Sequence, residues 1–196
     1  MLHDPLPRTV SVDQRRDGRQ ASVLLIGRVR HAQGESACLV RDISTHGLMA
    51  RFTVAPVVGD RLSIAVRGLA EVAATVRWVE GFRSGVEFDA AQDIARVFCL
   101  RDDRGHVART PRFAMHASAS MRVGDRRIAI DVLDISPGGA KLRGDTDLIV
   151  GEAVTIRLPQ LETATFGTIC WTREDRAGFR FSTPLSLASL SRVLGC

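Results

Sequence analysis

Two groups of polar residues in the first half of the chain have types and spacing that suit an anionic, hydrogen-bonding ligand. One is the arginine cluster Arg15, Arg16 and Arg19, and the other is the segment 42–47, which reads DISTHG. A guanidinium group is planar and donates paired hydrogen bonds to phosphates and to guanine edges. A carboxylate such as that of Asp42 accepts hydrogen bonds, so the two groups offer complementary chemistry.

The segment 42–47 also has a purely structural interpretation. Alternation along a strand would point Asp42 and Ser44 to one face and Ile43 to the core. Gly47 lacks the Cβ that would hinder a turn or a close approach. Asp and Ser before a glycine are common turn formers, however, so the same residues are typical of a hairpin that binds nothing. Both interpretations stand at this point.

The chain repeats this pattern in its second half. Four landmarks recur in the same order: an arginine segment, the DxSxxG motif, a tryptophan and a glycine. The second copies are Arg109 with Arg112, segment 134–139, Trp171 and Gly178, and the last two correspond to Trp78 and Gly85. Each pair lies about 92 to 93 residues apart. Four landmarks in register indicate two homologous units, and a chain of 196 residues accommodates two small domains.

Short apolar or alternating runs between the landmarks predict β-strands. In the first unit these runs are 23–26, 37–40, 48–52, 61–66, 73–79 and 85–88. Six short strands separated by glycine turns are typical of a small antiparallel barrel or sandwich. Apolar residues near helical spacing predict a helix over 93–100, and another over 188–194. The predicted organisation is an N-terminal tail at 1–14, a first domain at 15–104 and a second at 105–196.

These motifs make the chain similar to two tandem PilZ domains. The family pattern is RxxxR followed, after one hairpin, by DxSxxG or NxSxxG. The matching residues are Arg15, Arg19, Asp42, Ser44 and Gly47. The resemblance implies a mainly β fold of two six-stranded antiparallel barrels, each followed by a short helix. It also implies that the first domain binds cyclic di-GMP through these residues and Arg16, with no other cofactor.

The second copy matches the pattern less completely. Asp134, Ser136 and Gly139 fit the second motif, and Arg112 stands at the second arginine position, but an alanine occupies the first. Arg109 is one residue out of register. We therefore expect either a weaker second site made of these five residues or a domain that does not bind the nucleotide.

Composition places the chain among ordinary soluble proteins, with 45% hydrophobic and 25% charged residues. No apolar run is long enough to span a bilayer, and the first residues lack the apolar stretch of a secretory signal, so a cytoplasmic location is expected. The net charge of +5 is spread over both halves, and Lys141 is the only lysine. Nucleic-acid binding is disfavoured because there is no concentrated basic arm.

The remaining candidates for chemistry have plainer interpretations. The four cysteines are scattered without a CxxC pair, and the histidines do not cluster, so we expect buried, reduced thiols and neither disulfides nor a metal site. Trp78 and Trp171 could serve as stacking platforms, but their apolar neighbours and repeated position favour packing in the cores. Cys170, beside Trp171, is expected to pack in the core too.

Asp42, Ser44 and His46 have the residue types of a hydrolytic triad. They crowd onto one strand end, where the carboxylate cannot orient the imidazole toward the hydroxyl. We therefore expect no catalytic residues and no enzyme activity, with His46 exposed to solvent.

The functional hypothesis is a cytoplasmic receptor whose arginine arm folds over cyclic di-GMP and whose changed conformation is recognised by a protein partner. The alternative is a tandem scaffold that binds no nucleotide, in which the altered second copy forms an interaction or homodimer surface. The complete motifs of the first copy favour the receptor, and the incomplete arginine pair of the second favours the scaffold.

Overall fold

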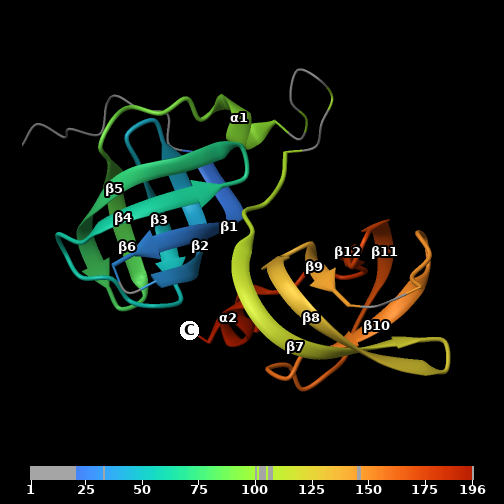
Figure 1. Cartoon of the computed structure of the whole chain (residues 1–196). Coiled ribbons are helices and arrows are strands. Elements are labelled where there is room, and N and C mark those ends of the chain that lie inside the picture. The colour runs from blue at the N-terminus through green and yellow to red at the C-terminus, as the bar shows by residue number, and fades with distance from the viewer. Residues whose placement is uncertain are drawn as a thin grey trace, which may run out of the picture.

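The computed structural model describes residues 21–32, 34–99, 101, 105, 108–144 and 147–195. Within these residues the chain forms two closed antiparallel β-barrels in tandem, each of six strands and each followed by a short helix (Figure 1). This architecture confirms the fold predicted from the sequence. Arg15, Arg16 and Arg19 lie outside the described residues.

The first barrel is formed by β1 to β6 and is followed by α1. The bounds are β1 Ala21–His31, β2 Gly34–Ser44, β3 Gly47–Phe52, β4 Arg61–Val66, β5 Leu69–Glu80, β6 Arg83–Phe88 and α1 Ala95–Phe98. The second barrel is formed by β7 to β12 and is followed by α2. The bounds are β7 Phe113–Val123, β8 Arg126–Ser136, β9 Gly139–Arg143, β10 Ala153–Arg157, β11 Thr165–Arg173, β12 Arg176–Phe181 and α2 Leu187–Leu194. Neither of these two helices in the described ranges is long and apolar enough to cross a membrane.

Both barrels have the same strand order. It runs β1-β2-β3-β6-β5-β4 in the first and β7-β8-β9-β12-β11-β10 in the second, and antiparallel pairing of the first strand with the fourth closes each barrel. Each barrel encloses an apolar core, because alternate residues of every strand point inward. Phe52 and Ile64 are buried in the first core, and Met121 and Ile156 in the second.

β-Bulges interrupt this alternation at matching places in the two barrels. In β5 the pairing shifts between Val76 and Trp78, and in β11 it shifts between Ile169 and Trp171. An extra residue at a bulge reverses the face that the following side chains reach. Val76 and Ile169 are buried, but Trp78 is 41% exposed and Trp171 38%. The prediction that both tryptophans pack in the cores is therefore wrong.

The cysteines also differ from the predicted set of buried thiols. Cys38 is fully buried, whereas Cys99 and Cys170 are exposed. Cys170 is the extra residue at the β11 bulge, so it does not reach the core as predicted. Burial raises the pKa of the Cys38 thiol to about 12, and a hydrogen bond with the Gly27 backbone opposes this effect.

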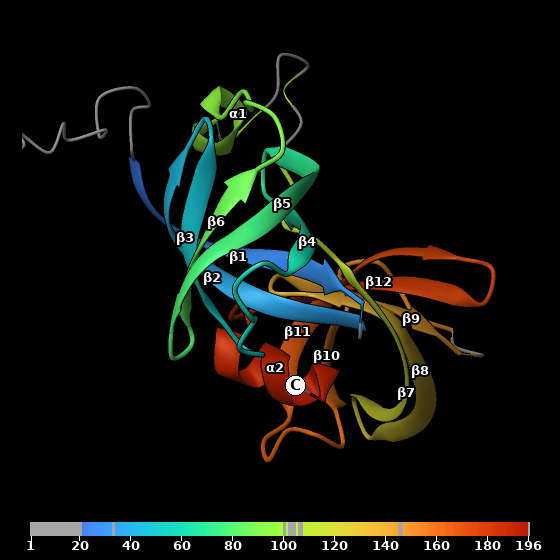
Figure 2. The ribbon, with the colours of Figure 1, turned by 90° about the vertical axis from the view of Figure 1, so that its left-hand side faces the viewer.

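The two barrels contact each other through the β1–β2 hairpin and α2 (Figure 2). Ala37 of β2 is fully buried and belongs to the apolar cluster of the second barrel, and Ile26 of β1 packs against that cluster. Arg28 Nη1 donates a hydrogen bond of 2.9 Å to the carbonyl of Arg112, just before β7. The first barrel thus completes the core of the second.

A polar network on β1, β4 and β5 holds Arg28 in place. The carboxylate of Glu71 accepts hydrogen bonds from Ser63 at 2.8 Å, Arg30 at 2.8 Å and Arg28 at 3.2 Å. The hydrogen bond from Ser63, followed by the contributions of Arg30 and Arg28, lowers the pKa of the Glu71 carboxyl. Glu71 therefore keeps the negative charge that positions Arg28 toward the second barrel at neutral pH.

We expect Ellman's reagent to distinguish the described cysteines in a Cys196→Ser variant. Because the pKa of Cys38 is about 12, only about one such thiol in 10,000 is ionised at pH 8. Two thiols should react rapidly in the native protein, and the third only in guanidinium chloride. An added Cys170→Ser substitution should remove one rapid thiol, whereas rapid reaction of three thiols in the native protein would contradict the burial of Cys38.

Candidate functional site

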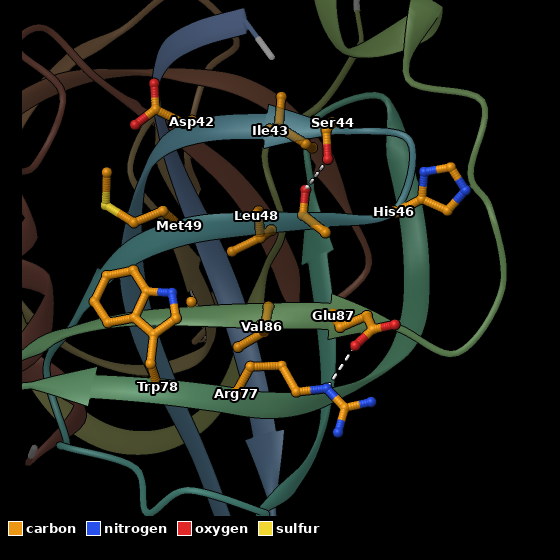
Figure 3. A pocket seen from close by; sticks show the side chains of 12 residues that line it. Asp42, Ile43, Ser44, His46, Leu48, Met49, Arg77, Trp78, Val86 and Glu87 are labelled. Carbon is orange, nitrogen blue, oxygen red and sulfur yellow. Dashed lines mark hydrogen bonds and ion pairs between the residues drawn. The ribbon is translucent and has the colours of Figure 1, made fainter. Parts of the chain in front are cut away.

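A row of four residues crosses the outer face of the first barrel. The strand register pairs Asp42 with Met49, Met49 with Gly85, and Gly85 with Trp78, so β2, β3, β6 and β5 each contribute one residue. Figure 3 shows the Asp42 carboxylate at one end of this barrel-1 row and the Trp78 indole at the other. Neighbouring strands lie about 4.8 Å apart, so the row spans roughly 14 Å.

The Trp78 indole lies directly over Gly85. A Cβ at Gly85 would be 2.0 Å from Trp78 Nε1, so only glycine leaves room for the ring there. One side of the indole covers the β6 backbone, and the ring is partly exposed to solvent. An exposed indole offers a surface on which a planar ring or a guanidinium group can stack. A stacking role for Trp78 was the less favoured of the two interpretations of its sequence, because its apolar flanks predicted core packing.

The barrel-1 row lines a hollow of about 340 Å³. Ser44, His46, Arg77 and Glu87 add polar groups to its lining. A second hollow of about 660 Å³ is lined by Ser22, Arg51 and Arg83 among others. Asp42 and Met49 line both hollows, so the carboxylate stands where the two meet.

The Asp42 carboxylate retains acceptor capacity for a ligand. Its Oδ1 accepts a hydrogen bond of 2.8 Å from the hydroxyl of Ser22 on β1. This is the one hydrogen bond that the Asp42 side chain makes within the described part of the chain, and no arginine there pairs with the carboxylate. The bulge between Val40 and Asp42 turns this side chain outward, while Ile43 is buried as predicted.

The other two residues of the motif have structural partners. Ser44 Oγ donates to the Gly47 carbonyl at 3.2 Å, which closes the turn between β2 and β3. A Cβ at Gly47 would be 2.3 Å from the Val86 carbonyl oxygen, so glycine permits the close approach of β6. Ser136 and Gly139 repeat this arrangement, with a hydrogen bond of 3.1 Å. Ser44 and Gly47 thus shape the edge of the hollow.

The three residues with triad chemistry do not bond to one another. Asp42 pairs with Ser22, Ser44 with the Gly47 carbonyl, and Nδ1 of the exposed His46 lies 2.9 Å from the Thr45 hydroxyl. The residues that the structure describes contain no group of three or more His, Cys, Asp or Glu side chains that could hold a metal ion.

The second barrel repeats the row with different side chains. Asp134 pairs with Lys141, Lys141 with Gly178, and Gly178 with Trp171, which we call the barrel-2 row. A Cβ at Gly178 would be 1.9 Å from Trp171 Nε1, so the indole lies over glycine as in the first barrel. Lysine replaces Met49 in the centre.

The Asp134 carboxylate already has a cationic partner. Arg112 Nη1 lies 2.5 Å from Asp134 Oδ1. Arg109, the other arginine predicted for a second site, is exposed and pairs with no carboxylate among the described residues. The structure thus brings Arg112, Asp134, Ser136 and Gly139 to one end of the second barrel, with the acceptor of the motif engaged within the protein.

Comparison with known families gives two matches along the chain. The model described as PilZ domain matches residues 13–98 and 106–196. No curated protein matches the sequence.

Several solved structures are similar to this chain at low identity. PlzA of Borreliella burgdorferi in complex with c-di-GMP is 9% identical with a TM-score of 0.43, covering 90% of this chain and 92% of that one. The inhibitor of motility MotI/DgrA of Bacillus subtilis is 12% identical with a TM-score of 0.35, covering 90% and 96%. YcgR of Escherichia coli in complex with c-di-GMP is 14% identical with a TM-score of 0.34, covering 88% and 83%.

We expect a side chain to be tolerated at Gly138 but not at Gly139. At Gly139 the new atom would lie 2.3 Å from the Phe179 carbonyl oxygen, whereas at Gly138 it would meet nothing within 4 Å. We expect Gly139→Ala to lower the free energy of unfolding by about 2 kcal/mol or more because the strand pairing must open. Gly138→Ala should leave it unchanged or slightly raised. Urea denaturation measures both, and equal values would rule out close strand approach as the reason for Gly139.

Proposed function

The chain belongs to the PilZ domain family, and from this premise we propose that its first barrel is a receptor for cyclic di-GMP. The observation that carries the proposal is the barrel-1 row, which places an acceptor carboxylate at Asp42 and an exposed indole at Trp78 on one outer face. The complete RxxxR motif at Arg15 and Arg19 precedes this face in the sequence. Cations, an acceptor and an aromatic surface are together what a ligand with phosphates and purine rings requires.

Each part of the proposed site has a complementary part in the ligand. Guanine offers N1–H and N2–H₂ as donors on one edge, and the Asp42 carboxylate accepts them. Its O6 and N7 acceptors, like the two phosphates, suit the guanidinium groups of Arg15, Arg16 and Arg19. The face of a guanine ring stacks on Trp78.

Covalent geometry supports a role for Arg19 beside Asp42. Arg19 precedes Ser22 by three residues, and the Ser22 hydroxyl is hydrogen-bonded to Asp42. Consecutive Cα atoms are 3.8 Å apart, so the Cα atoms of Arg19 and Ser22 are separated by about 11 Å at most. This limit keeps the arginine close enough to contact a ligand that also binds Asp42.

Ligand binding in this proposal changes what the protein presents to a partner. The arm that carries the arginines becomes ordered over cyclic di-GMP, at the end of β1 and β2 where Ser22 and Asp42 lie. The same two strands carry Arg28 and Ala37, which contact the second barrel. Ordering the arm therefore acts on a hairpin that also contributes to the interface between barrels, and a partner protein in the cytoplasm recognises the new arrangement.

The second barrel has a different role in this proposal. Its Asp134 is paired with Arg112 through Oδ1, so guanine would have to compete with this ion pair for the carboxylate. The same observation favours the second candidate function, an interaction module that binds no nucleotide, in which both barrels serve as a scaffold or a dimer surface. The two candidates differ in whether the first barrel binds cyclic di-GMP.

Calorimetric titration with cyclic di-GMP tests the receptor. We expect Arg19→Ala and Asp42→Ala each to weaken binding by about tenfold or more, because a hydrogen bond to a charged group contributes about 1.5–3 kcal/mol. Arg112→Ala and Asp134→Ala are the matched controls in the second barrel and should change the affinity by less than about twofold. GTP should give no comparable heat.

Two outcomes would contradict the proposal. Absence of heat and of a thermal shift at high cyclic di-GMP concentration would leave the interaction module. Equal losses in the two sets of variants would show that the copies share one site or bind alike.

A further inference from the structure

The outer face of the second barrel carries more cations than the equivalent face of the first. Strand pairing defines equivalent positions around Trp78 and Trp171. The charged residues on β3, on β5 after its bulge begins at Val76, and on β6 are Arg51, Arg77, Glu80, Arg83 and Glu87, and those on β9, β11 and β12 are Lys141, Arg143, Arg173, Arg176 and Arg180. Three positions carry a cation only in the second barrel, because Met49 corresponds to Lys141, Glu80 to Arg173 and Glu87 to Arg180. At a fourth position Arg77 corresponds to the uncharged Cys170. We call the five cations the barrel-2 basic face.

Strand register concentrates these cations around the indole. Arg143 lies opposite Arg176 on β12, and Arg176 lies opposite Arg173 on β11. Two residues further along β12, Gly178 lies between Lys141 of β9 and Trp171 of β11. β9, β12 and β11 are neighbours in the second barrel (Figure 1), so charges that are distant in sequence share one surface.

Some cations of the basic face have carboxylates beside them and others do not. Asp175 lies 3.4 Å from Arg143 and 3.7 Å from Arg176. In the strand register Asp131 lies opposite Arg143, and Asp134, which pairs with Arg112, lies opposite Lys141. Lys141, Arg173 and Arg180 pair with no carboxylate in the described parts of the chain. Like charges directly opposite each other on a sheet are destabilising, and a bound anion would remove this cost.

The equivalent line in the first barrel has its own counter-charge. Arg51 lies opposite Arg83 there, and Glu80 completes the line, with Arg83 Nη1 at 3.3 Å from its carboxylate. Arg173 stands where Glu80 would relieve the repulsion. In the second barrel Asp175 supplies the counter-charge for Arg143 and Arg176, and the additional cation Arg173 pairs with no carboxylate in the described residues.

We propose that the barrel-2 basic face binds single-stranded nucleic acid. Its phosphates contact Lys141, Arg173 and Arg180, and one base stacks on the exposed surface of Trp171. The indole favours a single strand, because bases inside a duplex do not expose their faces. A guanine-specific nucleotide is disfavoured, since Arg112 already neutralises Asp134 and occupies its Oδ1. With three strands about 4.8 Å apart, the face accommodates two or three phosphates.

Titration of a fluorescently labelled oligothymidylate of twelve nucleotides with the full-length protein, followed by fluorescence anisotropy, tests this site. Three phosphate contacts predict a slope of log K against log salt of about −2. Arg173→Glu with Arg180→Glu should weaken binding by about tenfold or more and flatten the slope. The first barrel carries glutamate at both equivalent positions, so the fold should tolerate the change, which circular dichroism verifies. Trp171→Ala should weaken binding by about fivefold or more and leave the slope unchanged.

Arg126→Glu with Arg127→Glu is the charge-matched control, because it alters the net charge equally at the exposed start of β8. It should change the affinity by less than about threefold. Equal losses in the two double variants would overturn the proposal, because only the overall charge would then matter. Absence of oligothymidylate binding at low salt would also overturn it, whether or not vesicles of phosphatidylglycerol bind. Displacement of the oligonucleotide by cyclic di-GMP would show instead that the face is a nucleotide site.

Discussion

The outer surfaces of both barrels depend on β-bulges in four strands. On a regular strand Asp42 would follow Val40, and Trp78 would follow Val76, into the core. One extra residue in β2 and another in β5 turn the carboxylate and the indole outward instead. The strand register then aligns both in one row across four strands. β8 and β11 have the same irregularities, so the barrel-2 row has the same geometry.

The alternation of apolar and polar residues, together with the repeated landmarks, was enough to predict six strands in each barrel. It also placed Ile43 in the core, and helical spacing of apolar residues predicted the two short helices. The same alternation misplaced Trp78, Trp171 and Cys170, because a bulge depends on pairing with a neighbouring strand and has no local sequence signal. For Ser44 the motif allowed a turn or a ligand, and only the hydrogen bond to Gly47 distinguishes a turn role. The clustering of the cations on β9, β11 and β12 could not be predicted from the sequence either. These residues, spread between 141 and 180, come together only through strand pairing.

The two copies show which parts of the barrel can change. Glycine lies under tryptophan in both, because any Cβ there would collide with the indole. The turn serine and glycine are likewise retained, because they permit close strand packing. Exposed positions carry no such constraint, so methionine and glutamates in one copy are lysine and arginines in the other. A shared backbone thus supports two surfaces of different chemistry, one with an open carboxylate and one with that carboxylate paired to Arg112.

The contact between Ala37 and the second apolar cluster has a consequence for biosynthesis. Ala37 belongs to the first barrel, but α2, which contacts β2, is separated from it by about 150 residues. During translation the first barrel leaves the ribosome early, and this apolar patch is exposed to solvent until α2 has been synthesised. The nascent chain therefore passes through a stage in which the first barrel is folded but the apolar surface around Ala37 is still exposed. Chaperones that bind exposed apolar groups would act on this intermediate.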